Sequence, residues 1–147
     1  MGALSIRVFG TPEAHAFALS LGRTLQLVNI LRDVDEDAGI ERVYVPLDRL
    51  AEAGLSDGPA VSIVSDPRFA GVCEALAREA QAGFAEADRL LTGLDRRALK
   101  PAILMMEGYR IVLGHLLRRG FQHRGPRPQP TRRDRLRLVA LALRSQP

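Results

Sequence analysis

The sequence predicts an all-α fold, and three observations support this prediction. The chain has 147 residues, of which 46% are hydrophobic but only 5% aromatic, with no Trp. Its core would therefore be built from Leu, Ala and Val, and Ala and Leu favour helices. Apolar residues recur at three- and four-residue spacing, which is typical of amphipathic helices, and no useful stretch alternates as a strand does. The length suits one helical domain or half-domain.

The first long helix is expected to begin at Thr11 and Pro12 and to end near Gly39. Thr is a good N-cap, Pro is favoured at the first helical position, and Gly is a common stop signal. Leu19 and Ile30 lie close to its polar side, so apolar residues cover most of its circumference, which indicates a largely buried helix. Its main apolar stripe is Phe17, Leu21, Leu25, Val28 and Leu31.

Three segments are expected in the middle of the chain. Residues 46–54 read as a short helix that a glycine ends, and residues 56–65 as a loop with a Gly-Pro pair. Asp66 and Pro67 would start a long scaffold helix that runs to about Leu91. Its expected core face is Phe69, Val72, Leu76, Ala80, Phe84, Ala87 and Leu91.

Residues 95–120 form the last long helical region. Pro101 lies either near the start of a new helix or at a kink. Gly125 and three nearby prolines separate this region from a terminal helix at about residues 132–144.

A strip of oxygen-bearing side chains is the strongest functional signal. On an ideal helix, Gln26, Asn29, Asp33 and Asp37 fall within roughly 80° of one another and about 6 Å apart along the axis. Mg²⁺ prefers such ligands and is usually held by one or two carboxylates together with substrate phosphates. The strip therefore predicts a magnesium and diphosphate site. The alternative is the charged side of an ordinary amphipathic helix.

A calcium-binding EF-hand loop is a second alternative, because Asp33, Asp35 and Asp37 alternate. It fails because the sixth position would be Ala38 instead of Gly and the twelfth Tyr44 instead of Glu.

The run at residues 25–37, followed by residues 42–46, resembles the second aspartate-rich motif of the squalene and phytoene synthase family. Residues 4–10 and 105–113 also resemble this family, and within it most of all the bacterial presqualene diphosphate synthases of hopanoid-type pathways. The resemblance covers residues from about 4 to about 120.

The resemblance implies an isoprenoid-synthase-type helical bundle in which two facing Asp-rich helices hold Mg²⁺. Such enzymes join two prenyl diphosphates head to head, here two farnesyl diphosphates to presqualene diphosphate. Family members are about twice this length, and no DxxxD precedes Asp33. We therefore expect residues 1–124 to be the C-terminal half of such a domain, which needs a complementing N-terminal half or self-association. The alternatives are a phytoene synthase-like reaction on geranylgeranyl diphosphate, and a non-catalytic remnant or interaction module.

The resemblance also implies roles for individual residues. Tyr44 and Tyr109 would lie near the reacting carbons, where a ring face stabilises a carbocation. The arginines suit diphosphate oxygens because the guanidinium group binds in a bidentate way. The metal ligands would be Asp33, Asp37 and Asn29, and the diphosphate-binding residues Arg32, Arg42 and Gln26.

Several of these residues have simpler explanations. Arg42 could form a surface ion pair with Glu41 or another acidic neighbour, and Tyr109 could be a packed core residue. A family arginine downstream of Tyr109 corresponds to either Arg124 or Arg127. His115 and His123 have no partners at zinc-ligand spacing, so we expect them to be structural.

Charge is distributed unevenly along the chain. From Arg118 onward there are nine arginines against Asp134 alone, a net charge of +8, whereas residues 1–117 carry −4. We therefore treat residues 125–147 as a Pro/Arg-rich linker and basic terminal helix. No nucleic-acid motif accompanies these arginines, so nucleic acid is not expected as a partner. A solvated helix, an anionic lipid surface and a prenyl diphosphate remain as explanations.

The lone Cys73 excludes an internal disulfide and is compatible with a reducing cytoplasm. Its helical Ala-Leu context indicates inert packing. No signal peptide and no apolar run of about 18 residues is found. We therefore expect a cytoplasmic protein, with at most peripheral contact to the inner face of the membrane.

Overall fold

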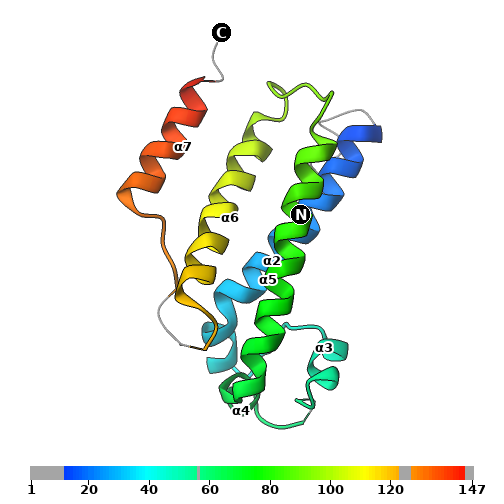
Figure 1. Ribbon diagram of the computed structural model, residues 1–147, viewed down its shortest axis with the longest axis vertical. Coiled ribbons are helices and arrows are strands. Elements are labelled where there is room, and N and C mark those ends of the chain that lie inside the picture. The colour runs from blue at the N-terminus through cyan, green and yellow to red at the C-terminus, as the bar shows by residue number, and fades with distance from the viewer. Residues whose placement is uncertain (1–11, 56, 123–126, 145–147) are drawn as a thin grey trace.

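The computed structural model describes residues 12–55, 57–122 and 127–144, and Figure 1 shows their arrangement. Within these ranges the chain forms helices and no strand, so the predicted all-α fold class is confirmed. The helices are α2 (Pro12–Gly39), α3 (Leu47–Glu52), α4 (Ala60–Ser65), α5 (Pro67–Leu90), α6 (Lys100–Arg119) and α7 (Arg132–Arg144).

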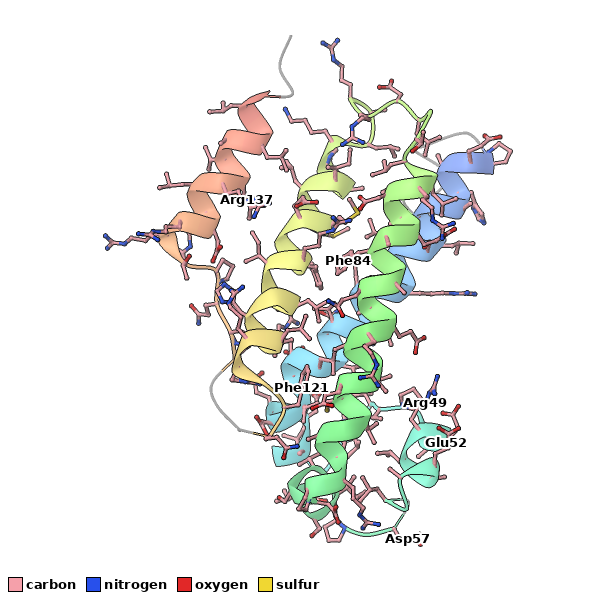
Figure 2. All side chains as sticks on the ribbon, viewed as in Figure 1. Arg49, Glu52, Asp57, Phe84, Phe121 and Arg137 are labelled. Carbon is pink, nitrogen blue, oxygen red and sulfur yellow. The ribbon has the colours of Figure 1, made fainter. Side chains whose placement is uncertain are left out.

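The long helices α2, α5 and α6 pack together as a bundle, and α7 packs against α6 (Figure 1). The short helices α3 and α4 lie at one end, where α3 contacts α5 and α4 contacts both α2 and α5. Figure 2 labels Arg49 and Glu52 on α3, which form an exposed ion pair. Arg49 also lies 3.6 Å from Glu79 of α5. Exposed ion pairs of this kind contribute little to stability.

The predicted core faces are confirmed. All five residues of the α2 stripe and all seven expected core residues from Phe69 to Leu91 are buried. Phe84 lies between α5 and α6 in Figure 2, and the Arg110 guanidinium lies 5.2 Å from its ring centroid. The expectation that α2 is buried around most of its circumference is wrong at Leu19, which is 48% exposed.

Residues 60–65 form α4 instead of the expected loop. No side chain next to this helix in sequence caps it, and Pro59 precedes it. The cap comes instead from Glu41, whose carboxylate accepts a hydrogen bond from the Ala60 backbone N–H at 3.2 Å. Because this acceptor lies 19 residues away in sequence, local composition could not indicate the helix.

The other helix boundaries follow local signals. The Asp66 carboxylate accepts a hydrogen bond from the Arg68 backbone N–H at 2.9 Å and so caps α5, with Pro67 in its first turn. The Arg68 guanidinium also binds Asp66 and lowers the pKa of that carboxyl to about 2. Pro101 lies in the first turn of α6, so it starts the helix and does not kink it.

None of the described helices is long and apolar enough to cross a membrane. The motif at residues 4–10, the Thr11 N-cap and His123 lie outside the described residues.

Helices α2 and α5 approach closely where Gly83 faces Thr24. Thr24 is buried, and its hydroxyl donates to the Ser20 backbone carbonyl at 2.9 Å. A Cβ atom at Gly83 would lie 3.2 Å from the Thr24 Cβ and Cγ2 atoms and would overlap its Oγ1 atom. This contact therefore sets the spacing of the two helices.

We predict that Gly83→Ala lowers the free energy of unfolding by about 1–3 kcal/mol, because the overlap with Thr24 overpacks the α2–α5 contact. The helix propensity of Ala alone would act in the opposite direction by up to about 1 kcal/mol. Urea denaturation followed by circular dichroism measures the change.

Gly71→Ala is the matched control, since Gly71 is exposed on α5 and its Cβ would meet no atom within 4 Å. It should stabilise the chain by roughly 0.5–1 kcal/mol. A Thr24→Ala background should remove most of the Gly83→Ala penalty. Equal effects of the two glycine substitutions would contradict the close approach.

Candidate functional site

The polar strip of α2 meets α6 at Asn29. The Tyr109 hydroxyl on α6 donates a hydrogen bond to Asn29 Oδ1 at 3.0 Å. One turn further along α2, the Arg32 guanidinium carbon lies 5.9 Å from the Tyr109 ring centroid. The tyrosine is half-buried and packs against the core. Its hydroxyl therefore contacts the strip, and its ring lies beside Arg32.

Asp33 is held by two arginines, its neighbour Arg32 and Arg127 from a distant part of the chain. Arg32 binds it in a bidentate way, with Nε and Nη2 at 2.8 and 2.7 Å from the two carboxylate oxygens. Arg127, which follows α6, donates from Nη2 to Asp33 Oδ1 at 2.5 Å and lies 3.8 Å from Glu36. Hydrogen bonds from Arg32, and then from Arg127, hold the pKa of Asp33 below its ordinary value. The carboxylate is therefore ionised at neutral pH.

An open groove lies beside this cluster, with a volume of about 520 Å³. Arg32, Tyr109 and Arg127 contribute its polar and aromatic lining. The remaining lining residues are mostly apolar or small: Met105, Gly108, Val112, Pro128, Gln129 and Pro130. A ligand with a charged head and an apolar body matches such a lining.

Asp37, Arg42 and Tyr44 form a second group at the end of α2. The Arg42 backbone N–H donates to the Asp37 carbonyl at 2.9 Å, and its guanidinium donates to the Tyr44 hydroxyl at 3.0 Å. The chain reverses here through Glu41, a non-glycine residue with a φ of 56°. Asp37, Arg42 and Tyr44 all line a small pocket of about 10 Å³, and Tyr44 is 50% exposed.

The structure thus brings the predicted site residues together in two neighbouring groups. Asn29, Arg32, Asp33 and Tyr109 share the first group with Arg127. The three residues of the second group lie next to it, since Asp33 and Asp37 are one helical turn apart on α2. The predicted residue Gln26 lies on the same helix, is exposed and forms no hydrogen bond with the described residues of either group.

The contacts of Arg42 and Arg127 bear on the simpler explanations of these residues. Within the described ranges Arg42 forms no ion pair with Glu41, whose carboxylate instead binds the Ala60 N–H. Of the two arginine candidates downstream of Tyr109, Arg127 contacts Asp33, whereas Arg124 lies outside the described residues.

His115 lies 2.9 Å from Asp134 of α7 through Nε2, a contact between helices. Burial raises the pKa of the Cys73 thiol to about 12, which agrees with inert packing.

Sequence reasoning missed the α6 side of the groove. Met105, Gly108 and Val112 share one face of α6 with Tyr109, because their spacing of three and four residues repeats with the helix. That periodicity in the sequence could have indicated the lining of the groove. The position of Glu36 beside Arg127 had no such signal, because it depends on where the chain returns after α6.

The oxygen donors suit Mg²⁺ bound together with a phosphate ligand. No group of three His, Cys, Asp or Glu side chains within the described part of the chain is arranged as a metal site. Two carboxylates one turn apart are nevertheless the usual protein share of a Mg²⁺ site that substrate phosphates complete. Asp33 keeps its negative charge, as a Mg²⁺ ligand must. The residues present therefore fit the ion.

The described residues form an all-α helical bundle with an acidic strip on α2. A profile of the family described as squalene/phytoene synthase matches residues 1–134. Together with the relatives below, this match shows that the chain belongs to the squalene/phytoene synthase family.

Curated relatives agree with this assignment. A presqualene diphosphate synthase of Sinorhizobium fredii (strain NBRC 101917 / NGR234) is 40% identical over 146 residues, which cover 98% of this chain and 51% of the relative. One of Rhodopseudomonas palustris (strain ATCC BAA-98 / CGA009) is 43% identical over 123 residues, 82% of this chain and 44% of the relative. Phytoene synthase 1, chloroplastic, of Zea mays is 36% identical over 124 residues, which cover 79% of this chain and 30% of the relative. The chain spans about half the length of the presqualene diphosphate synthases that it matches.

We predict that Asp33→Asn lowers the free energy of unfolding by about 1–2 kcal/mol at neutral pH, the size expected for lost hydrogen bonds to a charged group. Because folding lowers the pKa of Asp33, its contribution is complete above the unfolded value near 3.8 and is lost as the pH falls through the folded value. The difference between wild type and variant should therefore shrink below about pH 4. Urea denaturation at several pH values measures it.

Glu36→Gln is the control on the same helix, because Glu36 is exposed and lies 3.8 Å from Arg127. Its effect should stay within about 0.5 kcal/mol at every pH. A difference between wild type and Asp33→Asn that persists unchanged in acid would contradict the assignment.

Proposed function

We propose that this chain supplies one wall of a site that joins two prenyl diphosphates head to head, in the favoured case two farnesyl diphosphates to presqualene diphosphate. The observation that supports it is Asp33, an ionised carboxylate between Arg32 and Arg127 at the edge of a groove with an apolar lining. Membership of the squalene/phytoene synthase family and the names of the relatives point to the same reaction.

In this proposal the polar strip binds the diphosphate. Asp33 and Asp37, with Asn29, hold Mg²⁺ through oxygen atoms, and Gln26 supports the same ligand shell. Mg²⁺ supplies positive charge that stabilises the leaving diphosphate. Arg32 and Arg42 bind diphosphate oxygens, a task that suits a bidentate donor.

The remaining groups orient and protect the prenyl chain. Tyr109 lines the groove and donates its hydroxyl to Asn29. In the proposed site its ring face stabilises the allylic cation. Tyr44 takes the same role beside Arg42. Met105 and Val112 contact the apolar chain and keep water away from the cation.

The bond changes balance without a covalent enzyme intermediate. The C–O bond of one allylic diphosphate breaks, and its electron pair leaves with the diphosphate. The double bond of the second substrate attacks the resulting cation. Loss of a proton closes the cyclopropane ring, so the products are one cyclopropyl diphosphate, one diphosphate and one proton. Electrostatic stabilisation of the leaving charge lowers the barrier.

The predicted division of the chain belongs to the same proposal. Residues 1–124 act as the C-terminal half of the synthase domain, and residues 125–147 as a basic extension. A complementing N-terminal half or a second copy supplies the facing acidic helix. The reaction takes place in the cytoplasm, with the protein at most peripherally bound to the membrane.

A phytoene synthase-like reaction on geranylgeranyl diphosphate is the second candidate, because the maize phytoene synthase also matches the chain at 36% identity. A non-catalytic remnant is the third candidate. Turnover with each substrate separates the three.

We predict that the isolated chain shows little or no turnover and that addition of the N-terminal half of a full-length relative allows Mg²⁺-dependent product formation. In that complex Asp33→Ala and Asp37→Ala should each lower kcat by about 10²–10³-fold, the usual cost of losing one electrostatic stabiliser of the transition state. Product analysis by mass spectrometry with farnesyl and geranylgeranyl diphosphates identifies the substrate.

Glu13→Ala is the matched control, since it removes an exposed carboxylate from the first turn of the same helix, 20 residues before Asp33. It should leave kcat within about threefold of wild type, as expected for an exposed charge. Absence of product from either substrate in the presence of the added half would reject the enzyme and favour the remnant.

A further inference from the structure

The outer face of α7 carries apolar side chains that remain in contact with solvent. Leu136, Val139 and Leu143 are 69%, 55% and 61% exposed. At about 100° per residue they fall within roughly 60° of one another, so they form one row along the helix, which we call the α7 stripe. The outward face of a helix is normally polar. Exposure of the α7 stripe to water is therefore unfavourable unless a partner covers it.

The opposite face of α7 is already occupied by α6. Asp134 Oδ2 lies 2.9 Å from His115 Nε2 and accepts hydrogen bonds from the Thr131 backbone N–H and hydroxyl, both at 2.7 Å. Further along the helix, Leu141 lines a cavity together with Ile103 of α6. These contacts hold α7 on α6 and fix the direction in which the α7 stripe points.

Arginines border the α7 stripe. By helical geometry, Arg133 and Arg137 lie along one side of it and Arg135 along the other, with Arg132 at its beginning. All four are exposed, and Figure 2 labels Arg137 on α7. None of them forms an ion pair with a described acidic residue, and Asp134 is engaged by His115 and Thr131.

A second basic group extends this surface. Arg96 and Arg97 of the α5–α6 loop and Lys100 at the start of α6 line a cavity of about 280 Å³ together with Leu141 of α7. Figure 1 places the α5–α6 loop and the C-terminal end of α7 at the same end of the molecule. Positive charge therefore continues from α7 to the loop.

We propose that α7 is an interfacial helix through which the protein docks on an anionic lipid surface. The α7 stripe inserts among the acyl chains, and the bordering arginines extend to headgroup phosphates. Helices that lie in the membrane interface combine such an apolar face with basic residues beside it, and long basic side chains reach from apolar surroundings to polar ones.

The charges select this partner over a second copy of the chain. Two copies of α7 that met stripe to stripe would bring their arginine borders together, and like charges repel. A lipid surface offers both the apolar layer and the negative charge that the borders require. This inference is independent of the proposed reaction, because it concerns a different surface.

The test is sedimentation of the full chain with vesicles of phosphatidylcholine alone or with about one third phosphatidylglycerol, a negatively charged lipid. We predict binding to the anionic vesicles that weakens as salt is added. Leu136→Ser combined with Val139→Ser and Leu143→Ser should weaken binding roughly tenfold or more. Each of Arg133→Gln and Arg137→Gln should weaken it about fivefold, the factor that about 1 kcal/mol per cation gives.

The matched control replaces three exposed apolar residues elsewhere, Leu19→Ser with Leu47→Ser and Val61→Ser, which are 48%, 77% and 45% exposed. It should bind the vesicles as wild type does. Circular dichroism of both triple variants must show wild-type helicity, which is expected because none of the six side chains is buried.

Equal loss in both triple variants would overturn the role of the α7 stripe. Equal binding of wild type to neutral and anionic vesicles would overturn an anionic surface as the partner. Absence of vesicle binding together with dimerisation that the α7 substitutions abolish would assign the stripe to a second copy and reject the proposal.

Discussion

The position of α2 between α5 and α6 is the constraint on which the rest of the structure depends. One side of α2 buries Phe17, Val28 and Leu31 in the core. Because this side is fixed, the helical repeat also fixes the direction of the polar strip. Asn29 then faces Tyr109 of α6, and their hydrogen bond ties the strip to the groove. The close approach at Gly83 and Thr24 maintains the same packing from the α5 side.

Electrostatics at Asp33 follow from this packing. A half-buried carboxylate needs partners, since loss of water disfavours its charge. Arg32 comes from the same helix, whereas Arg127 arrives from the segment after α6. In the proposed site both guanidinium groups can exchange the carboxylate for phosphate oxygens, because the two acceptors offer similar geometry. The contacts of Asp33 are thus compatible with ligand binding as well as with stability.

Local signals predicted the long helices and their core faces because apolar periodicity and capping residues act over a few positions. Helix α4 was not predicted, because the side chain that caps it, Glu41, is distant in sequence. The acidic strip was visible for the same reason as the core faces, since it repeats with the helix. Its division into two groups was not visible, because it depends on the reversal at Glu41 and on where Arg127 returns. The functional roles of these residues stay predictions.

The segment from Arg127 to Thr131 connects the two surfaces for which we propose functions. At its start Arg127 binds Asp33, and at its end Thr131 binds Asp134 in the first turn of α7. Four residue steps span at most about 14 Å when extended. The groove and the start of the interfacial helix are therefore close. A prenyl diphosphate is itself amphipathic, so a site near the lipid surface would let the charged head reach Arg127 while the apolar chain stays in an apolar environment. Docking through α7 would in this way shorten the path of the substrate through water.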